Sequence, residues 1–266
     1  MAELEILLGK TVVLVAHPDD EAAGCGVLLQ RMQEPIVVFA TDGAPADSFF
    51  WAKHGSRDAY ARLRRDEARR ALKLAGVSQV EFLGEPDHSI RDQTLFTSLD
   101  LAIQELERII ERNQPQALLT LAYEGGHPDH DSCNFLTSLL ARHFGLPAWD
   151  FPLYHRATDG LIVHQHPLPS GSSQADDSEV VLQPTPSELE IKRRMLQTYA
   201  SQGDLKEFAA VIERFRPLPV YDYSRPPHDG VLNYEAWGWP IRGTQVSHAF
   251  VEFMKSNSEM AAGSRI

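Results

Sequence analysis

Three acidic side chains follow a short apolar segment near the N-terminus, in the sequence TVVLVAHPDDEAAGCG at residues 11–26. Asp19, Asp20 and Glu21 repel one another there, and removal from water further opposes their charges. A bound divalent cation is the simplest way to offset this repulsion. His17 precedes Asp20 by three residues, a spacing at which two side chains can point the same way as the chain enters a helix. An imidazole and a carboxylate are a plausible pair of zinc ligands.

A second group of candidate ligands lies in the sequence GGHPDHD at residues 125–131, which repeats His-Pro-Asp. His127 and His130 have the same spacing of three residues. A hydrolytic zinc ion usually takes three protein ligands and keeps one position for water, so this segment is a source for the ligand that the first segment lacks. Either segment alone could be a turn whose Asp caps a helix. Together they predict one shared metal site.

Short apolar segments bounded by turn residues predict β-strands, and amphipathic helical patterns separate them. Strands that alternate with helices form a mostly parallel sheet with helices on both faces. We therefore predict an α/β, Rossmann-like fold. Ligands of such sheets bind beyond the carboxyl ends of the strands, where both His-Pro-Asp segments lie. The expected strands are 11–16, 35–41, 79–84 and 117–122, and the expected helices are 60–76 and 95–113.

The second half of the chain is less regular. Residues 161–166 and 179–184 flank the polar sequence SGSSQADDS, which predicts either a long hairpin-type connection or a mobile loop. A helix capped by Ser187 is expected at 187–202, and the apolar face continues over 205–215.

The composition indicates a globular protein of 266 residues, of which 43% are hydrophobic. A net charge of −12 argues against nucleic acid and anionic membranes as partners. No apolar segment reaches the roughly 18 to 20 residues that span a bilayer, and the N-terminal residues lack a signal-peptide pattern, so we expect a cytoplasmic protein. Two cysteines, Cys25 and Cys133, make no disulfide framework and are expected to be packing residues.

The chain shows no internal repeat and no clear linker. We therefore predict a single domain over residues 1–266, with a core over about 10–150 and a C-terminal elaboration over about 151–266. The sequence leaves the oligomeric state open, with a homo-oligomer among the alternatives.

The segments AHPDDE and GGHPDHD resemble the LmbE-like, or PIG-L, family of zinc-dependent de-N-acetylases. The resemblance covers about residues 10–135 and includes ATDGAP, RRDEARRALKLAGV and FLGEPD. Members of this family remove acetyl groups from N-acetylglucosamine units. The resemblance thus implies a zinc-dependent hydrolase of a small-molecule amino-sugar substrate, and iron(II) also suits such ligands.

The resemblance also implies a role for each residue of the two segments. Asp19 would be the general base on the water that the metal activates. His127 would be the cation that stabilises the oxyanion and protonates the leaving amine, and Asp129 would orient His127 and favour its charged form. The zinc ligands would be His17, Asp20 and His130.

Arg64 and Asp87 are the expected substrate contacts. Arg64 and Glu67 match an Arg-x-x-Glu pattern of the family, whose arginine can reach a phosphate or sugar oxygen. The alternative is a solvated basic face of a helix. Asp87 matches an acid that bonds sugar hydroxyls in relatives, and the alternative is a turn-forming Asp after Pro86.

Two positions depart from the pattern of the family. Some relatives place a tyrosine two residues before the first histidine of the second segment, where this chain has Gly125; whether the nearby Tyr123 substitutes is open. His248 lies where relatives often carry an acid, and we expect a core histidine rather than an active-site contact.

Aromatic residues in two further segments have open roles. Trp237 and Trp239 are expected in the core, with stacking on a sugar as the alternative. Residues 44–58 carry Phe49, Phe50 and Trp51 and could form a substrate lid, a subunit contact or a helix on the sheet. Rival functions are a metal-dependent deacylase or esterase of a non-sugar substrate, and a catalytically idle sugar-binding relative.

Overall fold

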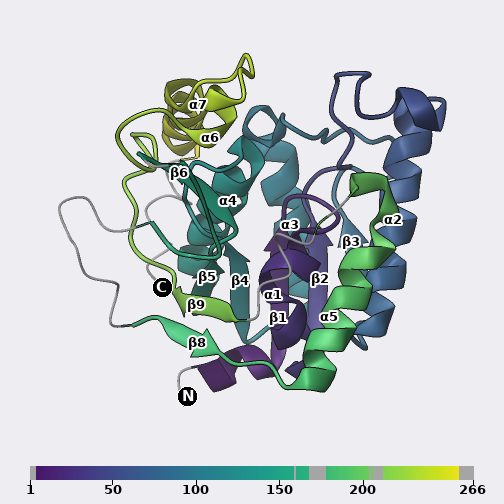
Figure 1. Cartoon of the computed structure of the whole chain (residues 1–266). Coiled ribbons are helices and arrows are strands. Elements are labelled where there is room, and N and C mark those ends of the chain that lie inside the picture. The colour runs from purple at the N-terminus through teal and green to yellow at the C-terminus, as the bar shows by residue number, and fades with distance from the viewer. Residues whose placement is uncertain (1–3, 159, 168–177, 204, 206–211, 258–266) are drawn as a thin grey trace.

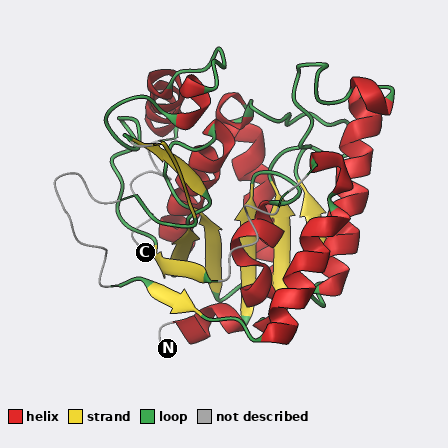
Figure 2. Ribbon diagram, viewed as in Figure 1, coloured by secondary structure: helices red, strands yellow, loops and turns green. Residues whose placement is uncertain are grey.

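A seven-stranded sheet forms the centre of the computed structural model, which describes residues 4–158, 160–167, 178–203, 205 and 212–257. The strand order is β3-β2-β1-β4-β5-β9-β8 (Figures 1 and 2). The five strands from β3 to β5 are parallel, and β9 and β8 continue the sheet antiparallel. The bounds are β1 Lys10–Val15, β2 Glu34–Phe39, β3 Gln79–Phe82, β4 Ala117–Leu121, β5 Ala148–Phe151, β8 Val180–Leu182 and β9 Glu213–Pro217.

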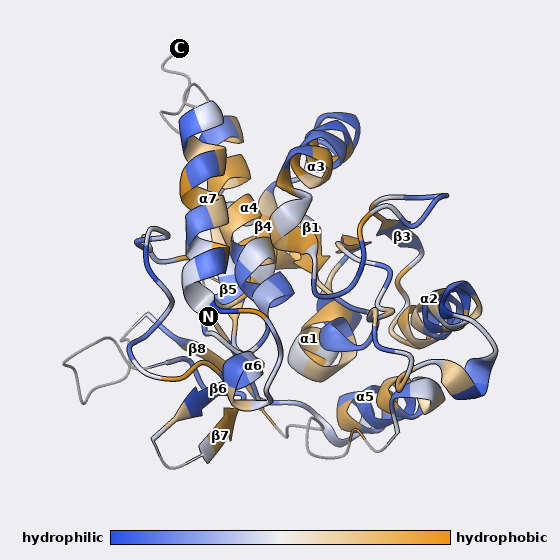
Figure 3. Cartoon of the chain, turned by 90° about the horizontal axis from the view of Figure 1, so that it is seen from above, coloured by the Kyte–Doolittle hydropathy of each residue, from blue (hydrophilic) through white to orange (hydrophobic). Residues whose placement is uncertain are grey.

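Helices cover both faces of this sheet (Figure 3). One face carries α1 Asp20–Arg31, α2 Arg57–Leu74 and α5 Pro186–Thr198, and the other carries α3 Leu99–Asn113, α4 Pro128–Phe144 and α7 Gly243–Ser256. The predicted α/β fold with a mostly parallel sheet is therefore confirmed. The short elements are α6 Asn233–Ala236, the two-stranded sheet of β6 Tyr154–Ala157 and β7 Gly160–Val163, and the 3-10 turns η1 Leu4–Leu8, η2 Ala52–His54, η3 Leu95–Thr97 and η4 Ala200–Gln202.

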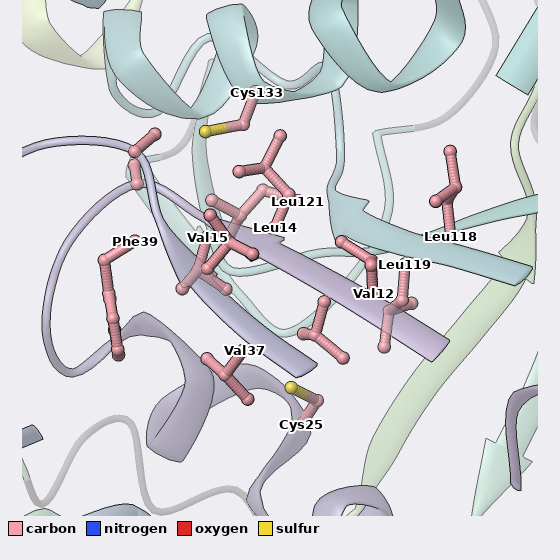
Figure 4. Packing of buried hydrophobic residues seen from close by; sticks show 14 of the residues in the cluster. Val12, Leu14, Val15, Cys25, Val37, Phe39, Leu118, Leu119, Leu121 and Cys133 are labelled. Carbon is pink, nitrogen blue, oxygen red and sulfur yellow. The ribbon is translucent and has the colours of Figure 1, made fainter. Parts of the chain in front are cut away.

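The core lies on both sides of β1, which pairs with β2 and β4 so that Val13 aligns with Val37 and Leu119 (Figure 4). Strands buried on both faces need continuous rather than alternating apolar residues, which explains their composition. Cys25 of α1 and Cys133 of α4 are buried and free, as packing residues should be. Within the described residues, no helix is long and apolar enough to cross a membrane.

The four predicted strands and two predicted helices of the first half are confirmed, with ends shifted by a few residues. In the second half, the cap of α5 is Thr185 rather than Ser187. The Thr185 hydroxyl accepts the backbone N–H of Glu188, and Glu188 returns a bond to the backbone of Thr185. This reciprocal pair is a capping box.

In the second half, the structure contradicts the described end of one predicted helix and one of two alternatives for the connection that follows β7. The helical reading of 205–215 fails at its described end, because residues 213–215 belong to β9, which pairs with β8 and β5; residues 206–211 lie outside the described residues. The segments 161–166 and 179–184 do not form a hairpin, since β7 pairs with β6 while β8 pairs with β9. The connection between them, 168–177, also lies outside the described residues.

Candidate metal centre

The two His-Pro-Asp segments meet at one edge of the sheet. β1 and β4 are parallel neighbours, so their carboxyl ends lie together, and His17 and His127 follow these two ends. α1 then begins at Asp20, and α4 begins at Pro128 with His127 as its N-cap. Proline suits the first helical position because its missing N–H would have no partner there. The sequence thus delivers its candidate ligands from two strand ends to one place.

The Asp20 carboxylate lies between two of the predicted ligands. Its Oδ2 is 3.4 Å from His17 Nδ1, and its Oδ1 is 3.3 Å from His130 Nε2. All three side chains are buried. With metal–ligand bonds of about 2.0–2.1 Å, neighbouring ligand atoms of a tetrahedral zinc ion are about 3.3–3.4 Å apart. Each separation is that of two neighbouring zinc ligands, but the two involve different Asp20 oxygens, and ligand atoms of His17, Asp20 and His130 do not all lie within 4.8 Å of one another.

The imidazole of His130 gives a second sign of a missing partner. Its Nε2 has only the 3.3 Å contact with Asp20, and among the described residues neither ring nitrogen has a partner with good hydrogen-bond geometry, although the side chain is fully buried. Buried polar atoms normally have partners, so an unpaired imidazole beside a carboxylate suits a cation.

His127 offers an alternative third ligand. Nitrogen atoms of His17, His127 and His130 lie within 4.8 Å of one another, and so do ligand atoms of a second group made of His17, Asp92, His127 and Asp129. The three imidazoles are therefore closer together than the predicted two-histidine, one-aspartate set, which would need small side-chain movements to share one ion.

Asp19 lies beside this cluster in an unusual backbone conformation. Its φ of 126° is rare for a residue with a side chain and costs about 1–3 kcal/mol unless the surroundings hold it. Three contacts do so: Arg64 donates to its Oδ2 at 3.1 Å, its backbone N–H donates to Glu21 Oε2 at 3.1 Å, and its carbonyl accepts from Ala23 N at 2.9 Å.

The Asp19 carboxyl is poised near neutrality. Burial raises the pKa of Asp19 from 3.8 to about 7, against the opposite effect of the Arg64 guanidinium. A general base is most effective when its pKa lies near the working pH. The position and pKa of Asp19 are both compatible with the predicted role.

The Arg64 guanidinium is already engaged by the protein. It donates to the carbonyl oxygens of Gly43 and Pro18, each at 2.5 Å, as well as to Asp19. Its companion Glu67 accepts the backbone N–H and the hydroxyl of Ser201, at 3.0 and 2.5 Å. The Arg-x-x-Glu pair is thus buried inside the protein and positions two loops, and it is not a solvated face.

Asp92 rather than Asp87 lies at the cavity. Asp87 is exposed on the turn after β3 and does not line the cavity described below. Asp92, which the sequence reading missed, is buried there, with Oδ1 3.5 Å from His127 Nε2 and Oδ2 3.8 Å from Arg64. Burial alone would raise the pKa of Asp92, but His17 and His127 hold it below its usual value. The only feature of the sequence that could have pointed to Asp92 is its place as an acid in the loop that follows β3.

The Asp129 carboxylate lies nearer to His17 than to His127. It accepts from His17 Nε2 at 3.1 Å and from the backbone N–H groups of Gln93 and Leu95, while His127 Nδ1 is 3.9 Å away. His127 Nδ1 instead accepts the backbone N–H of Asp129 at 3.1 Å, which leaves the proton of a neutral His127 on Nε2. Burial and the neighbouring His17 lower the pKa of His127, so this arrangement favours a neutral donor over the expected cation.

A cavity of about 340 Å³ opens beside the cluster, and aromatic rings form much of its wall. The ring centroid of Trp239 is 5.0 Å from that of His127 and 5.3 Å from that of Trp237. The ring centroid of Tyr154 is 5.8 Å from that of Trp237. Trp237 is 49% exposed. The expectation that the two tryptophans are core residues is therefore wrong, because both line the cavity.

The structure also shows where residues 44–58, Tyr123 and His248 lie relative to the cavity. Residues 44–58 contribute Pro45 and Phe50 to the cavity wall, which suits the lid alternative and excludes a long helix on the sheet. Tyr123 lies away from the cavity and donates to the carbonyl oxygen of Arg225. His248 is exposed on α7, so its expected place in the core is wrong.

Comparisons with known proteins agree with the motifs. Residues 12–141 match the model of the GlcNAc-PI de-N-acetylase (PIG-L) family, and the chain therefore carries a domain of this LmbE-like de-N-acetylase family. A 1D-myo-inositol 2-acetamido-2-deoxy-alpha-D-glucopyranoside deacetylase of Corynebacterium diphtheriae is 30% identical over 160 residues, 52% of this chain and 54% of the relative. The chain thus spans about half the length of that relative.

Solved structures share the fold at low identity. The A40926 pseudoaglycone deacetylase has a TM-score of 0.58 and 19% identity, over 78% of this chain and 96% of its own. GalB, the 4-carboxy-2-hydroxymuconate hydratase from Pseudomonas putida, has a TM-score of 0.54 and 16% identity, over 80% and 97%. Since a hydratase has the same fold, the activity must be argued from the site.

Proposed function

We propose that this protein is a metal-dependent hydrolase that removes the N-acetyl group from an N-acetylglucosamine-type sugar or conjugate. The observation that carries the proposal is the buried Asp20 carboxylate, 3.4 and 3.3 Å from nitrogens of His17 and His130, with Asp19 next to it at the cavity. His17, Asp20 and His130 would hold zinc, with iron(II) as the alternative. The family match and the named deacetylase relative support the same reaction.

The residues of the chain divide the remaining work. When bound, zinc lowers the pKa of water to about 7 and polarises a carbonyl. Asp19 accepts a proton from the attacking water, because its carboxylate lies at the cavity next to Asp20 and Arg64 holds it in place. His127 Nε2–H donates to the carbonyl oxygen as negative charge develops on it. The proton on Asp19 then passes to the leaving amine.

Replacement of the base tests this division. In Asp19→Asn, we expect the release of acetate from N-acetylglucosamine and N,N'-diacetylchitobiose to fall by about 10²–10⁴-fold, with the metal content unchanged. Retained turnover would contradict the role of Asp19. Activity on esters or non-sugar amides, with none on amino sugars, would favour the rival deacylase.

His127→Ala separates the two possible sets of ligands. If His127 acts only on the carbonyl oxygen, the variant keeps its metal, measured by elemental analysis, and loses turnover. Loss of the metal would instead assign His127 to the three-imidazole site. A cytoplasmic location and a homo-oligomeric state stay predictions.

A further inference from the structure

The cavity beside the metal centre has two apolar sides that come from different parts of the chain. The aromatic wall consists of Tyr154, Trp237 and Trp239, from β6 and the end of α6. The loop wall consists of Pro45 and Phe50, from the segment between β2 and α2. α6 and this segment reach the carboxyl edge of the sheet from opposite sides of the molecule (Figures 1 and 3).

Two of the polar side chains that line the cavity, Arg64 and Gln202, make hydrogen bonds within the protein. Arg64 is held by two backbone carbonyls and Asp19. Gln202 Nε2 donates to the hydroxyls of Tyr60 and Ser201. Gln93 and Asp92 also line the cavity and can meet sugar hydroxyls close to the metal centre, whereas the wall farther from it is formed by aromatic rings.

The exposure of the walls points to a ligand. Trp237 is a large apolar side chain that is 49% exposed, even though it packs beside the rings of Trp239 and Tyr154. Phe50, Tyr154 and Trp239 beside it are partly exposed, and apolar side chains that remain accessible in one concave site typically mark a binding surface. Aromatic rings next to the reaction centre offer area to a flat or apolar group.

We propose that the amino sugar carries an apolar aglycone, an alkyl or aryl group, which binds between the aromatic wall and the loop wall. This inference rests on the proposed function, because deacetylation places the N-acetyl group at C2 against Asp19 and His127. The anomeric carbon is next to C2, so a group attached there begins beside the metal centre and extends into the cavity.

Glycosides that differ only in the aglycone test the proposal. We expect octyl and phenyl N-acetylglucosaminides to have a KM about tenfold or more below that of the methyl glycoside, with similar kcat, because the aglycone contact is the same before and during reaction. Equal KM values for the methyl and octyl glycosides would overturn the inference. So would a preference that follows a longer N-acyl chain on the methyl glycoside.

Variants of the two walls localise the effect. In Trp237→Ala and Phe50→Ala, the tenfold ratio between methyl and octyl KM should collapse toward one, and Trp237→Phe should restore much of it. Both side chains are partly exposed, so the variants should fold. Phe49→Ala is the matched control, since Phe49 adjoins Phe50 but is 82% exposed and does not line the cavity. An equal collapse in Phe49→Ala would overturn the assignment.

A binding measurement separates this inference from the proposed function. Octyl N-acetylglucosaminide added to metal-free protein should change the tryptophan fluorescence at concentrations about tenfold below those needed for the methyl glycoside, and Trp237→Phe should reduce the change. Selective binding without turnover of any amino sugar would leave the aglycone site standing and overturn the hydrolase. Turnover of both glycosides without selective binding would support the hydrolase and overturn the aglycone site.

Discussion

The parallel half of the sheet and the C-terminal half of the chain contribute different things to one site. β1 and β4 end in the two segments that carry the candidate ligands and the proposed base, Asp19. The C-terminal half contributes the aromatic wall and a set of buried contacts that hold α1 and Asp19 in place. The candidate ligands thus come from two short segments of the sequence. The contacts that position α1 and Asp19 come from residues more than a hundred positions away.

Helix α1 shows this dependence most clearly. Cys25, with φ −136° and ψ 22°, interrupts the helix just after its first turn. The Glu213 carboxylate of β9 accepts the backbone N–H groups of Val27 and Leu28 at 2.8 and 3.0 Å, as a cap would. Lys192 of α5 neutralises the carboxylate at 2.7 Å, and both charged side chains are buried. The C-terminal half therefore supplies the hydrogen-bond acceptors that the interrupted helix α1 lacks within itself.

Removal of the metal should have the largest effect and tests the parallel half alone. We expect a chelator to abolish the hydrolysis of N-acetylglucosamine, and zinc to restore it, because the buried carboxylates then lose the ion that organises them. Circular dichroism should show that the fold persists. Full activity after verified metal removal would refute the metal centre.

Glu213→Ala tests whether the C-terminal half stabilises α1. The variant leaves the Lys192 ammonium buried without a partner, which should lower the free energy of unfolding by about 3–5 kcal/mol in urea titrations. The double variant Glu213→Leu with Lys192→Met is the control, because an apolar replacement of a buried pair costs much less. Equal losses in both would mean that capping of Val27 and Leu28, rather than charge pairing, dominates.

Tyr199→Phe tests the contact that reaches Asp19. The Tyr199 hydroxyl donates to Glu21, whose other oxygen accepts the backbone N–H of Asp19. Without this bond Asp19 should relax from its strained φ, and we expect kcat to fall about tenfold with little change in KM, as when a group acting in the transition state is displaced.

Tyr223→Phe is the matched control for Tyr199→Phe. The Tyr223 hydroxyl is also buried and donates to Asn134 Oδ1 at 2.6 Å, away from the metal centre. Each substitution should cost about 1–3 kcal/mol of stability by leaving an acceptor unpaired. A fall in kcat that is equal in both variants would mean that Tyr199 acts only through stability.

The smallest expected effect concerns the edge of the sheet in the C-terminal half. Burial lowers the pKa of His166, but hydrogen bonds to Asp150 and Glu179, at 3.1 and 2.7 Å, outweigh burial and the nearby Arg216 and raise it above 6.5. Because the folded state binds this proton more strongly, the stabilisation is complete below the unfolded pKa of about 6.5 and is lost as the pH rises through the folded pKa.

His166→Gln should remove that pH dependence. We expect the difference in free energy of unfolding between wild type and variant, measured in denaturant at a series of pH values, to shrink as the pH rises above about 6.5. A difference that grows with pH would reverse the assigned sign. Activity should follow stability only, because His166 does not line the cavity.

The sequence predicted the parallel strands, and it predicted the two His-Pro-Asp segments as one site. It could do so because apolar segments and helical spacing are local properties, and because parallel strands bring their carboxyl ends together. The same reasoning misplaced Asp87 and His248 and missed Asp92, since an acid or histidine in a loop carries no periodic signal of its direction.

Residue types and spacing by themselves predicted that candidate ligands would lie together at the carboxyl ends of β1 and β4. Only the tertiary structure decided that Trp237 and Trp239 line a cavity and that residues 213–215 form part of β9 instead of a helix. It also decided that Glu213 bonds to the backbone of α1 and that Tyr199 bonds to Glu21, which holds the backbone of Asp19. These contacts join residues far apart in the chain, and their energies come from burial and from pairing of buried polar groups, which exist only once the elements have packed.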